Sequence, residues 1–212
     1  MIRAVIFDLD GVIVSTDEFH FLAWHRLAQE EGIPFTRHDN EQLKGVSRME
    51  SLEIILRKSP KKFSQENKIA MAERKNSFYC DLLQKLSPSD ILPGVLVFLK
   101  ELKDRKIKTA IGSSSKNAGP ILSAIGLGDY FDAVADGTHI KKSKPDPEVF
   151  LLAASKVSIP PADCLVVEDA EAGVDAALAA KMRVLAVGSA SSLPRAHFRA
   201  QDLSQISVQQ LL

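Results

Sequence analysis

The chain has 212 residues, of which 45% are hydrophobic and 25% are charged, and its 27 basic and 27 acidic residues cancel. This length permits one large domain, or one domain with a smaller one inserted, and a core that needs no covalent cross-link. A neutral chain gives no electrostatic reason to expect nucleic acid or an anionic membrane as a partner. The composition therefore favours a globular protein that acts on small molecules.

The compartment is predicted from cysteine usage and hydropathy. Two cysteines, Cys80 and Cys164, are too few for a disulfide-framed secreted domain, and we expect both to be reduced. The chain opens on a strand-like segment without a signal-peptide pattern, and no apolar run reaches the roughly 18 residues that span a bilayer. We therefore expect a cytoplasmic protein, and nothing in the sequence demands more than a monomer.

Short apolar runs rich in β-branched residues predict buried parallel strands. These runs are Ala4–Phe7, Ile107–Ile111, Ala133–Ala135, Cys164–Val167 and Val184–Val187. Helical patterns lie between them; Val95, Leu99 and Leu102, for example, recur at i, i+4 and i+7. Strands that alternate with helices predict an α/β fold with a doubly wound, Rossmann-like parallel sheet covered on both faces.

One stretch interrupts this alternation. From about Ser15 to Ser87 the chain is almost wholly helical, and turn or hinge residues flank both ends. We predict that residues 15–87 form an α-helical cap domain inserted after the first strand. Residues 1–14 and 88–212 would then form the α/β catalytic core domain.

Acidic pairs follow two of the predicted strands. Asp8 and Asp10 come after the first strand, and an extended backbone would send them to the same side. Glu168 and Asp169 follow the strand that begins at Cys164. In parallel sheets ligands bind at the carboxyl ends of strands, and converging carboxylates favour Mg²⁺. The alternatives are a solvated acidic turn for the first pair and a helix N-cap for the second.

Two further strand ends carry groups suited to phosphate. Ile107–Ile111 leads into a serine-rich turn, residues 112–117, whose hydroxyls and amides can hold phosphate oxygens. The alternative is a turn that merely caps a helix. Lys144 stands between Ser143 and Pro145 on a segment that prolines stiffen, so it could balance the charge of carboxylates and phosphate. The alternative is a solvated surface lysine.

Together these motifs resemble those of the haloacid dehalogenase superfamily of phosphotransferases: Asp8–Val12, Ser113, Lys144–Pro147 and Glu168–Asp169. The resemblance covers the whole chain, because the helical insertion is similar to that family's cap. It implies that Asp8 becomes an aspartyl phosphate and that Asp10 is the general acid and base. It also implies one Mg²⁺ ion on Asp8, the Asp10 backbone carbonyl, Glu168 and Asp169, with Ser113 and Lys144 holding the transferring phosphoryl group.

The cap resembles that of the sugar-phosphate mutases in this superfamily. The resemblance assigns the non-reacting phosphate to Arg48, Ser115, Lys116 and Asn117. It assigns the sugar pocket to His20, Trp24, Lys44, Gly45, Val46, Ser51, Lys75 and Asn76. The implied reaction interconverts β-glucose 1-phosphate and glucose 6-phosphate through glucose 1,6-bisphosphate, which also primes the enzyme with phosphate.

Plainer interpretations remain for these cap residues and for the reaction. His20 and Trp24 could be core residues, and Lys44, Arg48 and Lys75 could be solvated charges. A Mg²⁺-dependent sugar-phosphate phosphatase on the same scaffold is the alternative function. A departure from the mutase pattern is Ser15 at the predicted hinge, where that subgroup usually has aspartate. The tail after Pro194 predicts nothing about function.

Overall fold

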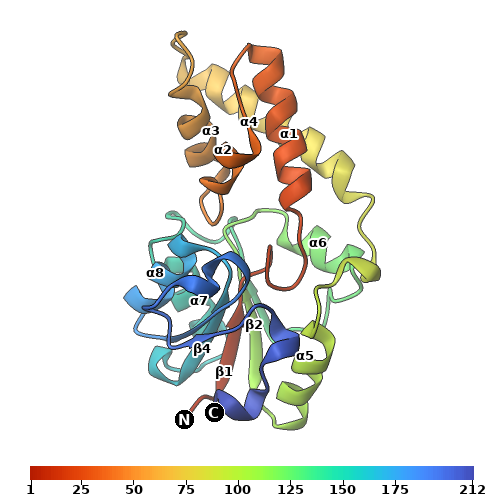
Figure 1. Cartoon of the computed structure of the whole chain (residues 1–212), viewed down its shortest axis with the longest axis vertical. Coiled ribbons are helices and arrows are strands. Elements are labelled where there is room, and N and C mark those ends of the chain that lie inside the picture. Colours follow the sequence, from red (N-terminus) through yellow and green to blue (C-terminus); the bar gives the residue numbers. More distant parts are fainter.

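A six-stranded sheet forms the centre of the lower half of the molecule in the computed structural model, which describes residues 1–212 (Figure 1). Every neighbouring pair is parallel, and the strand order is β3-β2-β1-β4-β5-β6. The strands are β1 (Ala4–Phe7), β2 (Lys108–Gly112), β3 (Ala133–Ala135), β4 (Cys164–Glu168), β5 (Arg183–Ala186) and β6 (Phe198–Arg199). The order steps outward on both sides of β1 and confirms the predicted doubly wound sheet.

Helices cover both faces of this sheet. Alternate residues of β1 enter different cores: Val5 and Phe7 pack on one face, and Ala4 and Ile6 on the other. The first face is covered by α5 (Val95–Asp104) and α6 (Ala118–Ala124), and the second by α7 (Glu148–Lys156) and α8 (Glu171–Ala179). Burial on both faces explains why the strands have continuous apolar sequences instead of alternating ones.

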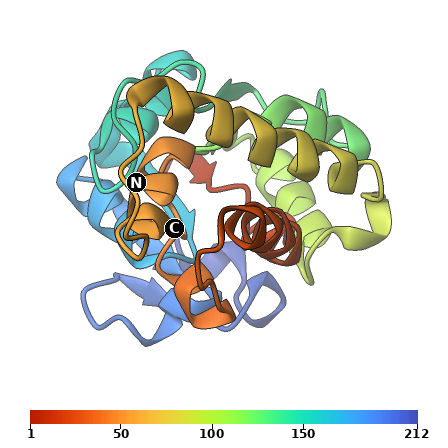
Figure 2. The same cartoon turned by 90° about the horizontal axis from the view of Figure 1, so that it is seen from above.

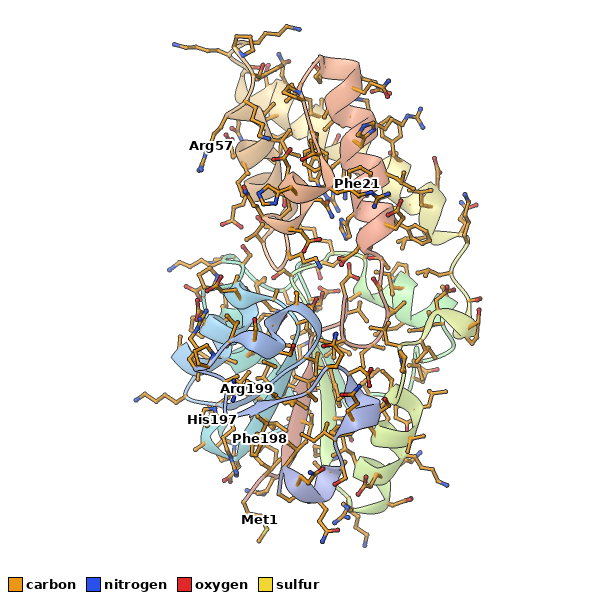
Figure 3. All side chains as sticks on the ribbon, in the orientation of Figure 1. Met1, Phe21, Arg57, His197, Phe198 and Arg199 are labelled. Atoms are coloured by element: carbon orange, nitrogen blue, oxygen red, sulfur yellow. The ribbon has the colours of Figure 1, made fainter.

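Residues between β1 and α5 form a separate group of helices at the top of Figure 1. They are α1 (Asp17–Glu31), α2 (Arg37–Glu41), α3 (Arg48–Leu56) and α4 (Gln65–Leu83). In Figure 2 the dark red α1 is seen end-on while the gold α4 crosses the view, and the two helices pack together. An apolar cluster of their own, which includes Trp24 and Leu52 with Phe21 at its edge, holds them (Figure 3).

Two backbone segments join these helices to the sheet and lie side by side. Val14 and Ile91 form an antiparallel bridge, and the Leu92 N–H donates to the carbonyl of Ile13 at 2.9 Å. A 3-10 turn, Pro88–Asp90, precedes the second segment. These contacts support our proposal that residues 15–87 are a cap domain on a double hinge.

The C-terminal tail contributes structure that the sequence did not indicate. It adds β6, which lies in the core half of the molecule away from the cap (Figure 3). Short 3-10 turns complete the core half: Pro161–Asp163, Gly188–Ser192, Leu203–Gln205 and Val208–Gln210. Leu203, Val208 and Leu211 are buried against the α5 face. None of the helices combines the length and apolar character that a bilayer crossing requires.

Candidate active site

A cavity of about 470 Å³ lies between the cap and the carboxyl ends of the strands. It is lined from the core by Asp8, Asp10, Ser113, Ser115, Lys116, Asn117 and Asp169 and from the cap by His20, Trp24, Lys44, Gly45, Val46, Arg48, Ser51, Lys75 and Asn76. The structure thus brings sixteen of the eighteen predicted site residues to one cavity. The other two, Lys144 and Glu168, are fully buried beside Asp8.

A buried ion cluster forms the floor of the cavity. The Lys144 Nζ donates to Asp8 Oδ1 at 2.5 Å and to Glu168 Oε2 at 2.8 Å. Burial alone would lower the pKa of Lys144, but the two carboxylates outweigh it and raise that pKa. The lysine therefore stays charged at the reacting end of the site. Its burial argues against a solvated surface lysine.

The second acidic pair sits at the end of β4. Glu168 Oε1 accepts the N–H groups of Asp169 and Ala170, both at 3.0 Å. Burial raises the pKa of Glu168 to about 7, with a smaller contribution from Asp8, although Lys144 opposes the shift. Burial first, and then the neighbouring carboxylates, raise the pKa of Asp169 to about 9. The helix that follows, α8, has Ala170 at its N-cap and no side-chain capping bond. Asp169 is therefore not a helix cap, which was the alternative interpretation.

The residues present fit a Mg²⁺ ion. Oxygen atoms of Asp8, Glu168 and Asp169 lie within 4.8 Å of one another, and all three residues are buried. Hard divalent ions prefer such carboxylate oxygens, and positive charge would relieve the repulsion that raises the pKa values. Gly11, at φ 79°, permits this approach, since a Cβ there would lie 2.1 Å from Asp169 Oδ2.

Asp10 has different hydrogen-bond partners from Asp8. Strand β1 ends at Phe7, so strand alternation covers neither aspartate, and the Asp10 carboxylate is not among the converging three. Instead it accepts the Thr16 N–H and hydroxyl, both at 2.6 Å. Burial and the charge of Asp17 raise the pKa of Asp10 to about 7, although the Thr16 bonds oppose the shift. Both aspartates still line the same cavity.

Cap side chains form a series of contacts that starts at Asp10. His20 Nε2 lies 3.6 Å from Asp10 Oδ2, and His20 Nδ1 lies 2.9 Å from Lys75 Nζ. Burial lowers the pKa of His20 and of Lys75 well below their ordinary values. The Lys75 Nζ lies 4.7 Å from the centre of the Trp24 ring, and this ring belongs both to the cap core and to the cavity wall.

Polar groups from both halves of the molecule meet on the rim of the cavity. The Asn117 side-chain amide donates to Asn76 Oδ1 at 3.0 Å, and the Ser114 hydroxyl donates to the Gly45 carbonyl at 3.1 Å. Arg48 is half-buried, and burial lowers its pKa. Lys44 instead pairs with Asp17 at 2.7 Å. Arg48 is therefore the cap cation most open to an anionic ligand.

The comparisons with known proteins agree with this geometry. A family model for haloacid dehalogenase-like hydrolases matches residues 2–181. The chain belongs to the haloacid dehalogenase-like hydrolase family. It is 44% identical to a β-phosphoglucomutase of Bacillus subtilis over 99% of this chain and 93% of the relative. It is 35% identical to a phosphorylated carbohydrates phosphatase of Thermotoga maritima over 84% of this chain and 81% of the relative.

A solved structure extends the match to three dimensions. A crystal structure of β-phosphoglucomutase from Clostridium difficile superposes with a TM-score of 0.95 at 42% identity, covering 100% of this chain and 96% of the other. Core and cap are therefore arranged as in a family member with the same inserted helices.

Sequence reasoning missed several residues at the centre of this family site. Thr16 binds Asp10, and its hydroxyl lies 2.8 Å from the Tyr79 hydroxyl. The Tyr79 ring packs against the His20 ring with centroids 4.2 Å apart and the ring planes tilted by 33°. Its position four residues after Lys75 on α4 was the available signal, because such residues share a helix face. Asp17 was missed as well, because acidic residues are common in the first turn of a helix, where they interact favourably with the helix dipole.

Proposed function

We propose that this chain is a β-phosphoglucomutase that interconverts β-glucose 1-phosphate and glucose 6-phosphate. The observation that carries the proposal is the cavity itself, which has a reacting carboxylate with a buried lysine at one end and Arg48, Lys116 and Asn117 on its rim. A mutase must hold two phosphates while the sugar turns around, whereas a phosphatase needs to hold one. The 44% identity to a β-phosphoglucomutase over nearly the whole chain supports the same conclusion.

In the proposed reaction Asp8 attacks the phosphorus atom and becomes an aspartyl phosphate. The Asp8 carboxylate and the phosphate are both anionic and repel each other. The Lys144 ammonium, 2.5 Å from Asp8, offsets part of that repulsion. Bound Mg²⁺ would supply further positive charge at the equatorial phosphate oxygens. Splitting the transfer into two steps lets the aspartyl phosphate give its phosphoryl group to one sugar position, which forms the bisphosphate, and lets the freed carboxylate then take the phosphoryl group from the other position.

Asp10 is the proposed general acid and base. A carboxyl group with a pKa of about 7 exists in both protonation states at neutral pH, so it can give a proton to a leaving oxygen and take one from a sugar hydroxyl. Thr16 fixes its orientation. We further propose that glucose 1,6-bisphosphate primes Asp8 and that a small sugar phosphate is the sole partner the site requires.

We propose that the guanidinium of Arg48 binds the non-reacting phosphate. Arginine donates two parallel hydrogen bonds to a phosphate, which fixes orientation as well as charge. Ser115, Lys116 and Asn117 line the same cavity and complete the grip. Lys44, Gly45, Val46 and Ser51 would shape the sugar pocket.

The test is a phosphorus magnetic resonance assay with β-glucose 1-phosphate, Mg²⁺ and trace glucose 1,6-bisphosphate. We expect glucose 6-phosphate to form faster than inorganic phosphate. Release of inorganic phosphate as the main product would instead favour the phosphatase function.

Asp8→Asn tests the nucleophile assignment in the same assay. The amide is a poor nucleophile, so we expect turnover to disappear while the far-ultraviolet circular dichroism spectrum stays that of the parent. Turnover near the parent rate in this variant would exclude Asp8 as the nucleophile.

A further inference from the structure

A hydrogen-bonded link joins the cap to the core at Glu50. Its carboxylate atom Oε2 accepts the Ser47 N–H at 3.0 Å, the Ser47 hydroxyl at 2.7 Å and the hydroxyl of Ser143. The Ser47 N–H also lies 3.3 Å from Ser143 Oγ. Ser47 and Glu50 belong to the cap, whereas Ser143 belongs to the core, so one carboxylate oxygen gathers donors from both.

The two ends of this link adjoin residues of the proposed chemistry. Ser47 is the N-cap of α3, and Arg48 is the first residue of that helix. On the core side, Ser143 immediately precedes Lys144, which is bound to Asp8. The link therefore connects the backbone that carries the phosphate-gripping arginine to the backbone that carries the lysine at the reacting carboxylate.

We propose that Glu50 is a positioning residue: by binding Ser143 it fixes Arg48 at a set place relative to Lys144 when the cap is closed. This proposal rests on the mutase function proposed above, because only a substrate held at both phosphates needs that separation. Glu50 does not line the cavity and touches no reacting atom.

A comparison with a second helix start shows what is particular to Glu50. At α2 the same capping box joins Thr36 and Asp39, and the further partner of Asp39 is Lys58, also in the cap. Glu50 forms the capping box of α3 in the same way, but it also accepts a hydrogen bond from Ser143 of the core. Burial would raise the pKa of Glu50, but the Ser143 and Ser47 bonds outweigh it and lower that pKa, so the acceptor stays ionised.

The experiment measures glucose 6-phosphate formed against inorganic phosphate released in one reaction. Both products come from the same aspartyl phosphate, so their ratio does not depend on how much of the protein is folded. Attack by water uses only the core groups around Asp8, whereas attack by the free hydroxyl of a bound sugar monophosphate, which forms the bisphosphate, needs Arg48 in place. A merely structural role would lower both rates together and leave the ratio unchanged.

Ser143→Ala removes the core donor and leaves the α3 capping box intact, and Glu50→Ala removes both. We expect each to lower the ratio about fivefold, the change that a hydrogen bond of ordinary net strength makes in an equilibrium. Glu50→Gln should stay close to the parent, because its amide oxygen can take the place of Oε2. Thr36→Ala, the matched control, should lower stability without moving the ratio.

The outcomes separate this proposal from the function on which it rests. If the parent forms no glucose 6-phosphate, the mutase function itself fails. If the parent forms it and Ser143→Ala and Glu50→Ala leave the ratio unchanged, or Thr36→Ala shifts it equally, then Glu50 is a helix cap and the positioning role is wrong.

Discussion

Replacing Asp169 by asparagine should stabilise the metal-free protein and abolish its response to Mg²⁺. Burial and the neighbouring carboxylates raise the pKa of Asp169 from 3.8 to about 9. At pH 7 the folded chain therefore keeps a proton that the unfolded chain has released, which costs roughly 4 kcal/mol of stability. Asparagine titrates no proton but still buries a polar group, so we expect a gain of about 2 kcal/mol. For a chain of this size that is roughly 4–8 °C in Tm.

The assay is thermal unfolding followed by circular dichroism, with a chelator and then with excess Mg²⁺. The parent should unfold at a higher temperature with the ion, because binding to the folded state alone stabilises it. The variant should not respond. Asp129→Asn, an exposed turn residue, is the matched control and should behave like the parent.

The pH dependence has a definite sign. The folded-state pKa values of Glu168 and Asp169 are raised above the unfolded ones, so the folded chain binds the extra protons. Stability without metal must then fall as pH rises toward 9, and Mg²⁺ should remove most of that fall. If Asp169→Asn is less stable than the parent without metal, or if Mg²⁺ still raises its Tm as in the parent, the account of a strained acidic cluster is refuted.

Three other substitutions, with a fourth as a control, test separate parts of the site. Arg48→Lys should raise KM for the sugar phosphate about tenfold or more in steady-state assays, because lysine cannot make the two parallel bonds. Gly173→Ala should abolish activity, since its Cβ would lie 1.9 Å from Glu168 Oε2, whereas Gly119→Ala, with open space, should raise Tm slightly and keep full activity. Lys75→Met should raise Tm but reduce kcat; burial lowers the pKa of Lys75, so this gain should fade as pH approaches the ordinary lysine value of 10.5. Equal activity in both glycine variants, or a lower Tm for Lys75→Met at neutral pH, would contradict these expectations.

The sheet was predictable because its strands are buried on both faces. Continuous apolar runs gave β1 and β3 with their observed bounds and placed β2 one residue early, at Ile107–Ile111. The two-residue β6 has no such run, and its pairing with β5 depends on how the tail packs. Contacts between distant segments, not local preference, decide that part of the fold.

The site residues were predictable where the chemistry restricts the residue type. The contacts of a side chain were not predictable where they depend on how distant segments pack. Carboxylates after strand ends predicted the cluster of Asp8, Glu168 and Asp169. The partners of Asp10 were not predictable from alternation, because the strand ends three residues earlier and Thr16 donates two hydrogen bonds to its carboxylate. The sequence alone does not tell which of the nearby groups the Asp10 carboxylate will bind.

The distribution of partners between core and cap explains why the cap should decide what accepts the phosphoryl group. In the core, Asp8, Lys144 and Glu168 satisfy one another, so the reacting end is assembled without any cap residue. Arg48 differs, because burial lowers its pKa and no carboxylate forms an ion pair with it, so its charge is available to an anionic ligand. Attack by water needs only these core groups, whereas attack by the hydroxyl of a bound sugar monophosphate needs the core groups and Arg48 together. We therefore expect cap–core contacts, such as that of Glu50 with Ser143, to determine whether water or a sugar hydroxyl completes the reaction.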